Sequence, residues 1–155
     1  MYKRVDKVYK SFGGKAMQSV EEILKSLELP EEDNKRRKHV LVVDDDVRML
    51  RMIRKQLESE YDIATAVNGK VALKFLETKH TDLILLDYEM PVEDGPSVLE
   101  KIRQNSRWKD LPVIFLTGVS SKEKIQEVLQ LRPQGYILKP INRQRLLLEI
   151  EKIIG

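Results

Sequence analysis

Short apolar runs alternate with longer segments of helical periodicity from His39 to the end of this 155-residue chain. Five of the short runs fit β-strands: Val40 to Val43, Asp62 to Ala66, Leu83 to Leu86, Val113 to Leu116 and Tyr136 to Leu138. Three of them are almost wholly apolar, which is typical of interior parallel strands covered on both faces. The alternation predicts an α/β fold with a five-stranded parallel sheet and helices on both faces.

Apolar residues at helical spacing follow each predicted strand. The sets are Leu50, Ile53 and Leu57; Ala72, Phe75 and Leu76; Val98, Leu99 and Ile102; Ile125, Val128 and Leu129; and Leu147, Ile150 and Ile154. Asn68 and either Ser120 or Ser121 stand where N-caps are expected, and Pro96 fits a first helical turn. These segments supply the helices that cover the sheet.

The first 38 residues are expected to form an extension to a main domain at residues 39–155. Within the extension, Val20, Ile23, Leu24 and Leu27 have the i, i+3, i+4, i+7 spacing of an amphipathic helix. Its apolar stripe needs a partner, which could be the main domain, a second copy of the chain or another protein. A homodimer through this helix is therefore one expectation.

Charge and composition narrow the function classes. The net charge of +3 lies wholly in the first 38 residues, which hold 10 basic and 7 acidic side chains, so the main domain is balanced and is not expected to bind nucleic acid. A nucleic-acid arm at Lys35 to Lys38 is the remaining alternative. The chain has no cysteine, which excludes disulfides and thiolate chemistry. Without a long apolar run or a secretory signal, we expect a cytoplasmic protein that does not contact membranes.

Polar side chains stand where the predicted strands end. Asp44, Asp45 and Asp46 follow the first strand and Asp87 the third, while Thr117 ends the fourth and Lys139 the fifth. Because ligands of open α/β sheets bind beyond the carboxyl ends of the strands, these groups are expected to meet at one edge.

A cluster of carboxylates is stabilised by a cation. With only oxygen ligands at hand, a hard ion such as Mg²⁺ is implied, and Mg²⁺ commonly shares its coordination with phosphate oxygens. Lys139 could then neutralise a phosphoryl oxygen and Thr117 could donate a hydrogen bond to another. Asp87 is the best-placed carboxylate nucleophile.

Four segments resemble the signature of the response-regulator receiver domain of two-component signalling, including its chemotaxis-regulator-like members. They are Val42-Val43-Asp44-Asp45, Leu85 to Pro91 with Gly95, Phe115-Leu116-Thr117-Gly118, and Gly135 to Pro140. The separations from Asp87 to Thr117 and from Thr117 to Lys139, 30 and 22 residues, also agree with that family. The resemblance covers His39 to Gly155 and implies a flavodoxin-like (βα)5 fold.

The resemblance implies a phosphorelay function. Asp87 would accept a phosphoryl group from a sensor histidine kinase or a histidine phosphotransfer protein, and the domain would act on a downstream effector protein. Such a domain is a signalling phosphoprotein rather than an enzyme, with only Mg²⁺-dependent self-phosphorylation and autodephosphorylation.

The resemblance also assigns roles to single residues. Asp44, Asp45, Asp87 and the backbone carbonyl of Glu89 would hold Mg²⁺. The phosphoryl-contacting and switch residues would be Thr117, Lys139 and Tyr136, the Tyr136 ring turning inward on activation. The bond before Pro140 is expected to be cis.

Two departures leave alternatives open. Asp46 makes a third consecutive aspartate, so the metal-binding pair could be shifted by one residue, with Asp46 otherwise a helix cap. Glu89 and Gly118 differ from common family residues, which leaves the phosphoryl lifetime open.

A competing enzyme hypothesis is an aspartyl phosphatase of the haloacid-dehalogenase type, because Asp44 and Asp46 formally meet its Asp-x-Asp pattern. Arg48 stands where that family has Thr.

Overall fold

The computed structural model describes residues 36–118 and 122–155, and Arg37–Gly155 forms one compact unit. Five strands build one sheet, β1 (His39–Val43), β2 (Asp62–Ala66), β3 (Leu83–Asp87), β4 (Val113–Thr117) and β5 (Gly135–Leu138). Their order is β2-β1-β3-β4-β5 and every pairing is parallel. The predicted fold class is confirmed, with each predicted strand placed to within one residue at either end.

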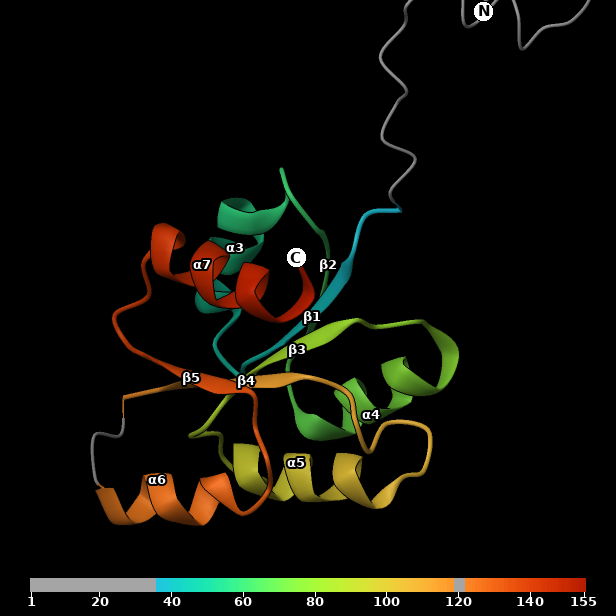
Figure 1. The fold of residues 1–155 in the computed structure, drawn as a ribbon, viewed down its shortest axis with the longest axis vertical. Helices are drawn as coiled ribbons and strands as arrows, with labels where there is room; N and C mark the ends of the chain where they lie inside the picture. The colour runs from blue at the N-terminus through green and yellow to red at the C-terminus, as the bar shows by residue number, and fades with distance from the viewer. Residues whose placement is uncertain (1–35, 119–121) are drawn as a thin grey trace, which may run out of the picture. The chain divides into compact units, whose positions relative to one another are not determined.

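Five helices connect and cover the strands: α3 (Val47–Leu57), α4 (Gly69–Thr78), α5 (Gly95–Gln104), α6 (Lys122–Leu129) and α7 (Arg143–Ile154). Figure 1 shows α3 and α7 on one face of the sheet and α4, α5 and α6 on the other. Among the described helices, none is both long and apolar enough to cross a membrane. The predicted amphipathic helix at residues 19–27, and the caps Ser120 and Ser121, lie outside the described residues.

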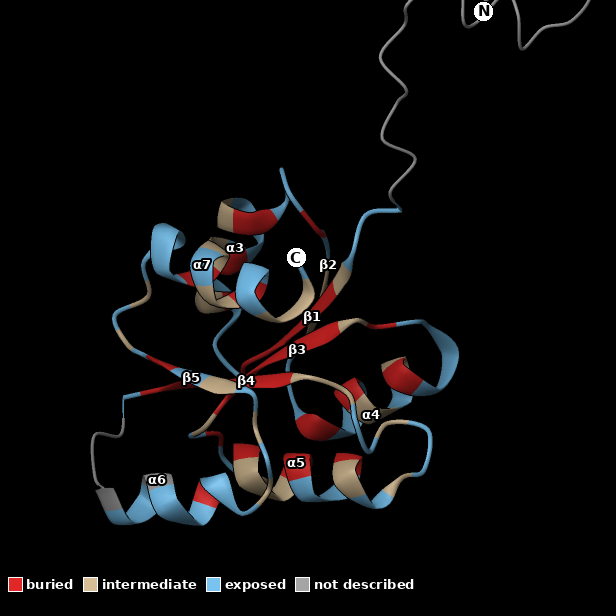
Figure 2. Cartoon of the chain, viewed as in Figure 1, coloured by how far each residue is buried: buried red, intermediate tan, exposed pale blue. Residues whose placement is uncertain are grey.

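Two apolar cores lie on opposite faces of the sheet. Along β1, Leu41 and Val43 pack with the core under α4 and α5, whereas Val40 and Val42 pack with the core under α3 and α7. The central strands β1, β3 and β4 are buried almost throughout, and the outward faces of the helices are exposed (Figure 2). This double burial explains why their sequences are continuous apolar runs.

Short polar side chains start the helices. Asp46, Asn68, Asp94 and Asn142 each accept a hydrogen bond from a backbone N–H in the first turn, at α3, α4, α5 and α7 respectively. The predicted cap Asn68 and the position of Pro96 in the first turn of α5 are confirmed. In α7, Leu146 and Ile150 are fully buried, and Leu147 and Ile154 of the set at helical spacing are partly buried and pack against the same core.

Candidate functional site

The register of β3, β4 and β5 brings three predicted site residues to one edge of the sheet. Asp87 is level with Leu116, and Thr117 is level with Leu138, so Asp87, Thr117 and Lys139 all lie at the carboxyl ends of their strands. The Lys139 backbone N–H donates to the Thr117 carbonyl at 2.9 Å, which extends the ladder by one residue beyond β5. Parallel pairing therefore converts three positions distant in sequence into one site.

Three carboxylates converge at this edge. One oxygen from each of Asp44, Asp45 and Asp87 lies within 4.8 Å of the others. Asp44 and Asp87 are buried, with 1% and 3% of their surface exposed, whereas Asp45 faces solvent. The site thus combines two desolvated carboxylates with one that can contact an arriving ligand.

Lys139 is the cation of the site. Its Nζ donates a hydrogen bond to Asp87 Oδ1 at 3.0 Å and lies 3.8 Å from Asp44 Oδ2. The Lys139–Pro140 peptide bond is cis, as expected. Among the described residues, one ammonium group, that of Lys139, therefore faces the two buried carboxylates, and it cannot neutralise all three acidic groups.

The pKa values of the two buried carboxyl groups reflect this lack of positive charge. Burial, opposed by the hydrogen bond from the Asp46 N–H and assisted by the charge of Asp87, raises the pKa of Asp44 to about 6. Burial also raises the pKa of Asp87, against the hydrogen bond and charge of Lys139 and a hydrogen bond from the Glu89 backbone N–H. Burial lowers the pKa of Lys139, but contact with Asp87 outweighs it, so that the Lys139 pKa is raised. An additional cation would stabilise this cluster.

The donor set fits a hard divalent cation. Asp44 Oδ2 is buried and accepts no hydrogen bond in the described part of the chain, so it retains lone pairs directed into the cluster. The other oxygens come from carboxylates, and among residues 36–118 and 122–155 no histidine joins Asp44, Asp45 and Asp87. Oxygen-only coordination of this kind suits Mg²⁺ rather than zinc or copper.

The remaining predicted site residues differ in burial and in whether they join the acidic cluster. Thr117 is buried at the end of β4, whereas the ring of Tyr136 on β5 is 39% exposed. Asp46 is exposed and caps α3 by accepting from the Arg48 N–H at 2.9 Å. Asp44 and Asp45 therefore join the acidic cluster with Asp87, whereas Asp46 caps α3. This geometry favours the pair Asp44 and Asp45 over the pair shifted by one residue, and it leaves Asp46 of the Asp-x-Asp phosphatase pattern outside the cluster.

Sequence reasoning missed part of the support beneath Asp87. Gly95 N–H donates to the Tyr88 carbonyl at 2.9 Å, and a Cβ at Gly95 would collide with the Asp87 carbonyl oxygen. Asp94 caps the helix that begins there. The Asp-Gly pair after the acceptor motif was the available signal, because it is typical of a tight turn.

The basic run Lys35 to Lys38 is partly engaged with the domain. The Arg37 side chain donates to the carbonyls of Glu58 and Tyr61 and lies 3.5 Å from a carboxylate oxygen of Asp62. Arg37 therefore extends the compact unit two residues before β1, and Lys35 of the predicted basic run lies outside the described residues.

Comparison with known proteins identifies a family. Residues 40–151 match the response regulator receiver domain. The chemotaxis protein CheY of Pseudomonas aeruginosa is 34% identical over 116 residues, which cover 74% of this chain and 94% of that protein. A probable transcriptional regulator, ycf27 of Cyanidium caldarium, is 34% identical over 129 residues, 83% of this chain and 51% of the relative.

Solved structures agree with this family. Chemotaxis protein CheY4 of Vibrio cholerae aligns with a TM-score of 0.74 at 31% identity, covering 77% of this chain and all of that one. The receiver domain of a sensor histidine kinase from Pseudomonas aeruginosa aligns with a TM-score of 0.71 at 28% identity, over 77% of this chain and 99% of that one. That structure holds a magnesium ion in its active-site cleft. The chain spans about half the length, or less, of several curated relatives, which are larger proteins.

Proposed function

This chain belongs to the response regulator receiver domain family, and from that premise we propose that Asp87 is its phosphoryl acceptor. Its function is that of a two-component receiver domain, a signalling role rather than that of a conventional enzyme. We assign this function to residues 39–155. The observation that carries the assignment of Asp87 is the buried carboxylate at the end of β3 in contact with Lys139 and beside Asp44 and Asp45.

The chemistry proposed is one transfer of a phosphoryl group. A carboxylate oxygen of Asp87 attacks phosphorus, the bond from phosphorus to the imidazole nitrogen of a donor phosphohistidine breaks, and that nitrogen leaves with the electron pair. Lys139 neutralises negative charge on the phosphoryl oxygens, and the Thr117 hydroxyl donates a hydrogen bond to one of them. Little else is required, because phosphoryl transfer depends mainly on positioning and charge.

Asp44, Asp45, Asp87 and the Glu89 carbonyl would hold Mg²⁺ in this proposal. When bound, that ion neutralises charge that builds up between the carboxylates and the incoming phosphoryl group. The orphaned Asp44 Oδ2 and the raised Asp44 pKa support this assignment. Self-phosphorylation from small donors and autodephosphorylation would require the same ion.

The switch proposed for the domain couples the site to the face around β5. A phosphoryl group adds nearly two negative charges and strong hydrogen-bond acceptors. Thr117 would move towards these oxygens, and the Tyr136 ring would turn from solvent into the space vacated. The partners of this device would be a sensor histidine kinase or histidine phosphotransfer protein on the input side and an effector protein on the output side.

Labelling with a small phosphodonor tests the acceptor. With acetyl phosphate and Mg²⁺, the wild-type chain should gain the mass of one phosphoryl group, whereas Asp87→Asn should gain none, because an amide oxygen is a poor nucleophile. Asp46→Asn is the matched control: asparagine also caps helices well, so α3 and labelling should persist. Full labelling of Asp87→Asn, or loss of labelling in Asp46→Asn alone, would contradict the assignment.

A further inference from the structure

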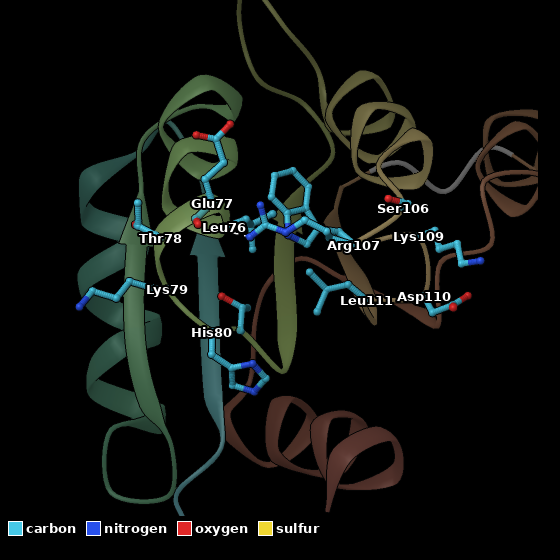
Figure 3. Close-up of a pocket in the computed structure, with 12 residues that line it drawn as sticks. Leu76, Glu77, Thr78, Lys79, His80, Ser106, Arg107, Lys109, Asp110 and Leu111 are labelled. Atoms are coloured by element: carbon cyan, nitrogen blue, oxygen red, sulfur yellow. Dashed lines mark hydrogen bonds between the residues drawn. The ribbon is translucent and has the colours of Figure 1, made fainter.

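A groove of about 500 Å³ lies at the opposite edge of the sheet from Asp87. Its walls are residues 76–81, at the end of α4 and before β3, and residues 106–111, between α5 and β4 (Figure 3). Thr81 and Leu111 stand shortly before the first residues of β3 and β4, so the groove is at the amino ends of the strands. Nothing in the phosphoryl chemistry uses this edge.

One polar group in the groove wall has no partner. Only 8% of Thr81 is exposed, and its hydroxyl oxygen makes no hydrogen bond within the described part of the chain. A buried hydroxyl without a partner is energetically costly, so natural structures seldom leave one without a reason. The oxygen has less than 1 Å² of accessible surface, so a ligand in the groove would meet it only after the Thr81 side chain rotates towards the groove.

The guanidinium group of Arg107 is the second observation. It extends across the groove towards Leu76 and Glu77 (Figure 3), and its Nη2 donates to the Glu77 carbonyl at 3.3 Å. Its carbon lies 5.5 Å from the centre of the Trp108 ring. No carboxylate of the described residues forms an ion pair with Arg107, so most of its N–H donors remain available for a planar, two-oxygen acceptor.

We propose that this groove binds an acidic segment of a partner protein, with a carboxylate on Arg107 and an apolar side chain against Trp108. Arginine and tryptophan are the residue types that dominate binding energy at protein interfaces. Lys79 and Lys109 extend on opposite sides of the groove (Figure 3). With Arg107 they outnumber the two acidic residues of the lining, Glu77 and Asp110, so the groove carries an excess of one positive charge that would attract a negatively charged chain.

A chain segment fits this site better than an enclosed small molecule. Most residues of both walls are exposed, among them Lys79, Arg107 and Lys109, and the buried portion is confined to its floor at Leu76 and Thr81. Small-molecule sites bury most of the ligand surface in a largely apolar pocket. A peptide instead needs an open trough with a few anchoring groups, which is what the two connecting segments form.

Fluorescence of Trp108 tests the proposal, because it is the only tryptophan of the chain. The full chain is titrated with the acetylated and amidated peptide Gly-Asp-Leu-Glu-Gly and with its uncharged counterpart Gly-Asn-Leu-Gln-Gly. The acidic peptide should give a saturating change, with Kd at least fivefold lower than that of the uncharged peptide. Amide chemical shifts should change at residues 76–81 and 106–111.

Matched variants separate a site from a general charge effect. Arg107→Gln should weaken binding at least fivefold, and Thr81→Val should weaken it as well, whereas Arg51→Gln, an exposed arginine on α3, should leave it unchanged. Equal melting temperatures of the two glutamine variants would exclude unfolding as the cause. Equal affinity of Arg107→Gln, or no binding of the acidic peptide at millimolar concentration, would overturn the proposal. Free glutamate binding as tightly as the peptide would overturn it too, in favour of a small carboxylate.

Discussion

At the residue scale, the site is governed by the cost of burying two carboxylates beside one ammonium group. Lys139 contacts Asp87 at 3.0 Å but lies 3.8 Å from Asp44, so Asp44 receives the weaker compensation. The raised pKa of Asp44, about 6, is the result. The residues that would receive Mg²⁺ are therefore destabilising when no ion is bound, a common compromise between stability and function.

The raised pKa of Asp44 should make the stability of the metal-free protein depend on pH. Its pKa is about 6 in the folded chain and 3.8 for an unperturbed group, so between these values the folded state binds more protons than the unfolded state. The free energy of unfolding contributed by this group must then fall as pH rises through that window, by about 2–3 kcal/mol in total. Asp44→Asn removes the charge and retains an oxygen for the Asp46 N–H.

Denaturant unfolding in EDTA measures this effect. Asp44→Asn should be more stable than the wild type by on the order of 2 kcal/mol at pH 7.5, and the difference should shrink towards pH 4.5. The exposed neighbour Asp45→Asn is the control and should change stability less. A less stable Asp44→Asn at pH 7.5 in EDTA would show that the Asp44 charge is not a burden to the fold.

At the element scale, the β3–α5 connection fixes the position of the acceptor. Gly95 begins α5 against the backbone of Asp87, and any Cβ there would meet the Asp87 carbonyl as well as Tyr88 Cα and Phe115 Cε1, both at 2.9 Å. These neighbours are backbone and a fully buried ring, so they cannot move cheaply. The start of α5 and the end of β3 are thus packed as one unit.

Two glycine substitutions test this packing. Gly95→Ala should destabilise the chain by about 1–3 kcal/mol through overpacking. Gly118→Ala should stay within about 0.5 kcal/mol, because a Cβ there meets nothing within 4 Å. Thermal unfolding of the two variants under one condition gives the comparison; equal melting temperatures would refute the tight contact at Gly95.

Elements buried on both faces were the most predictable from sequence. The runs at β1, β3 and β4 are almost wholly apolar because helices cover both sides. The strand-end residues Asp44, Asp87 and Thr117 could be placed at one edge from topology alone. The helical spacing did not single out the fully buried Leu146, because Leu146 and Leu147 both fit a helical spacing with Ile150 and only packing in the fold separates them. The positive φ of Val92, 71°, carries no sequence signal, because valine rarely adopts it.

Electrostatics and backbone contacts were harder to predict from the sequence. The four segments of the receiver signature indicated which side chains form the site, but not that Asp44 Oδ2 lacks a hydrogen bond or that the Glu89 backbone N–H donates to Asp87. Backbone donors have no residue identity in a sequence, and desolvation depends on what the fold places above each carboxylate. The groove at Thr81 and Arg107 was missed for the same reason.

At the scale of the whole molecule, the parallel sheet gives the domain two distinct edges. All carboxyl ends of the strands lie on the edge with Asp87, and the amino ends lie on the edge with Arg107 and Trp108. Between them, the exposed side chains of Tyr136 and Leu138 on β5 form a face that a change at Thr117 would reach through the adjacent strand. Two-state behaviour of this face would connect phosphorylation with partner binding.

The proposed switch predicts burial of Tyr136. Tyr136 is 39% exposed in this structure. When beryllium fluoride and Mg²⁺ are added as a phosphoryl mimic, the rate at which hydroxyl radicals modify Tyr136 should fall severalfold relative to the protein without them. Leu148 on α7, 50% exposed, is the internal control and should not change. The decrease should be lost in Asp87→Asn; unchanged Tyr136 modification in the wild type would mean that the ring does not report activation.

The most direct measurement is the chemical identity of the phosphorylated residue. Borohydride reduces an aspartyl phosphate to homoserine, so reduction of the labelled chain followed by peptide mass spectrometry locates the acceptor. We predict homoserine at position 87 and aspartate retained at positions 44, 45 and 46. Homoserine at any of those three positions, or a labelled chain with aspartate intact at position 87, would contradict it.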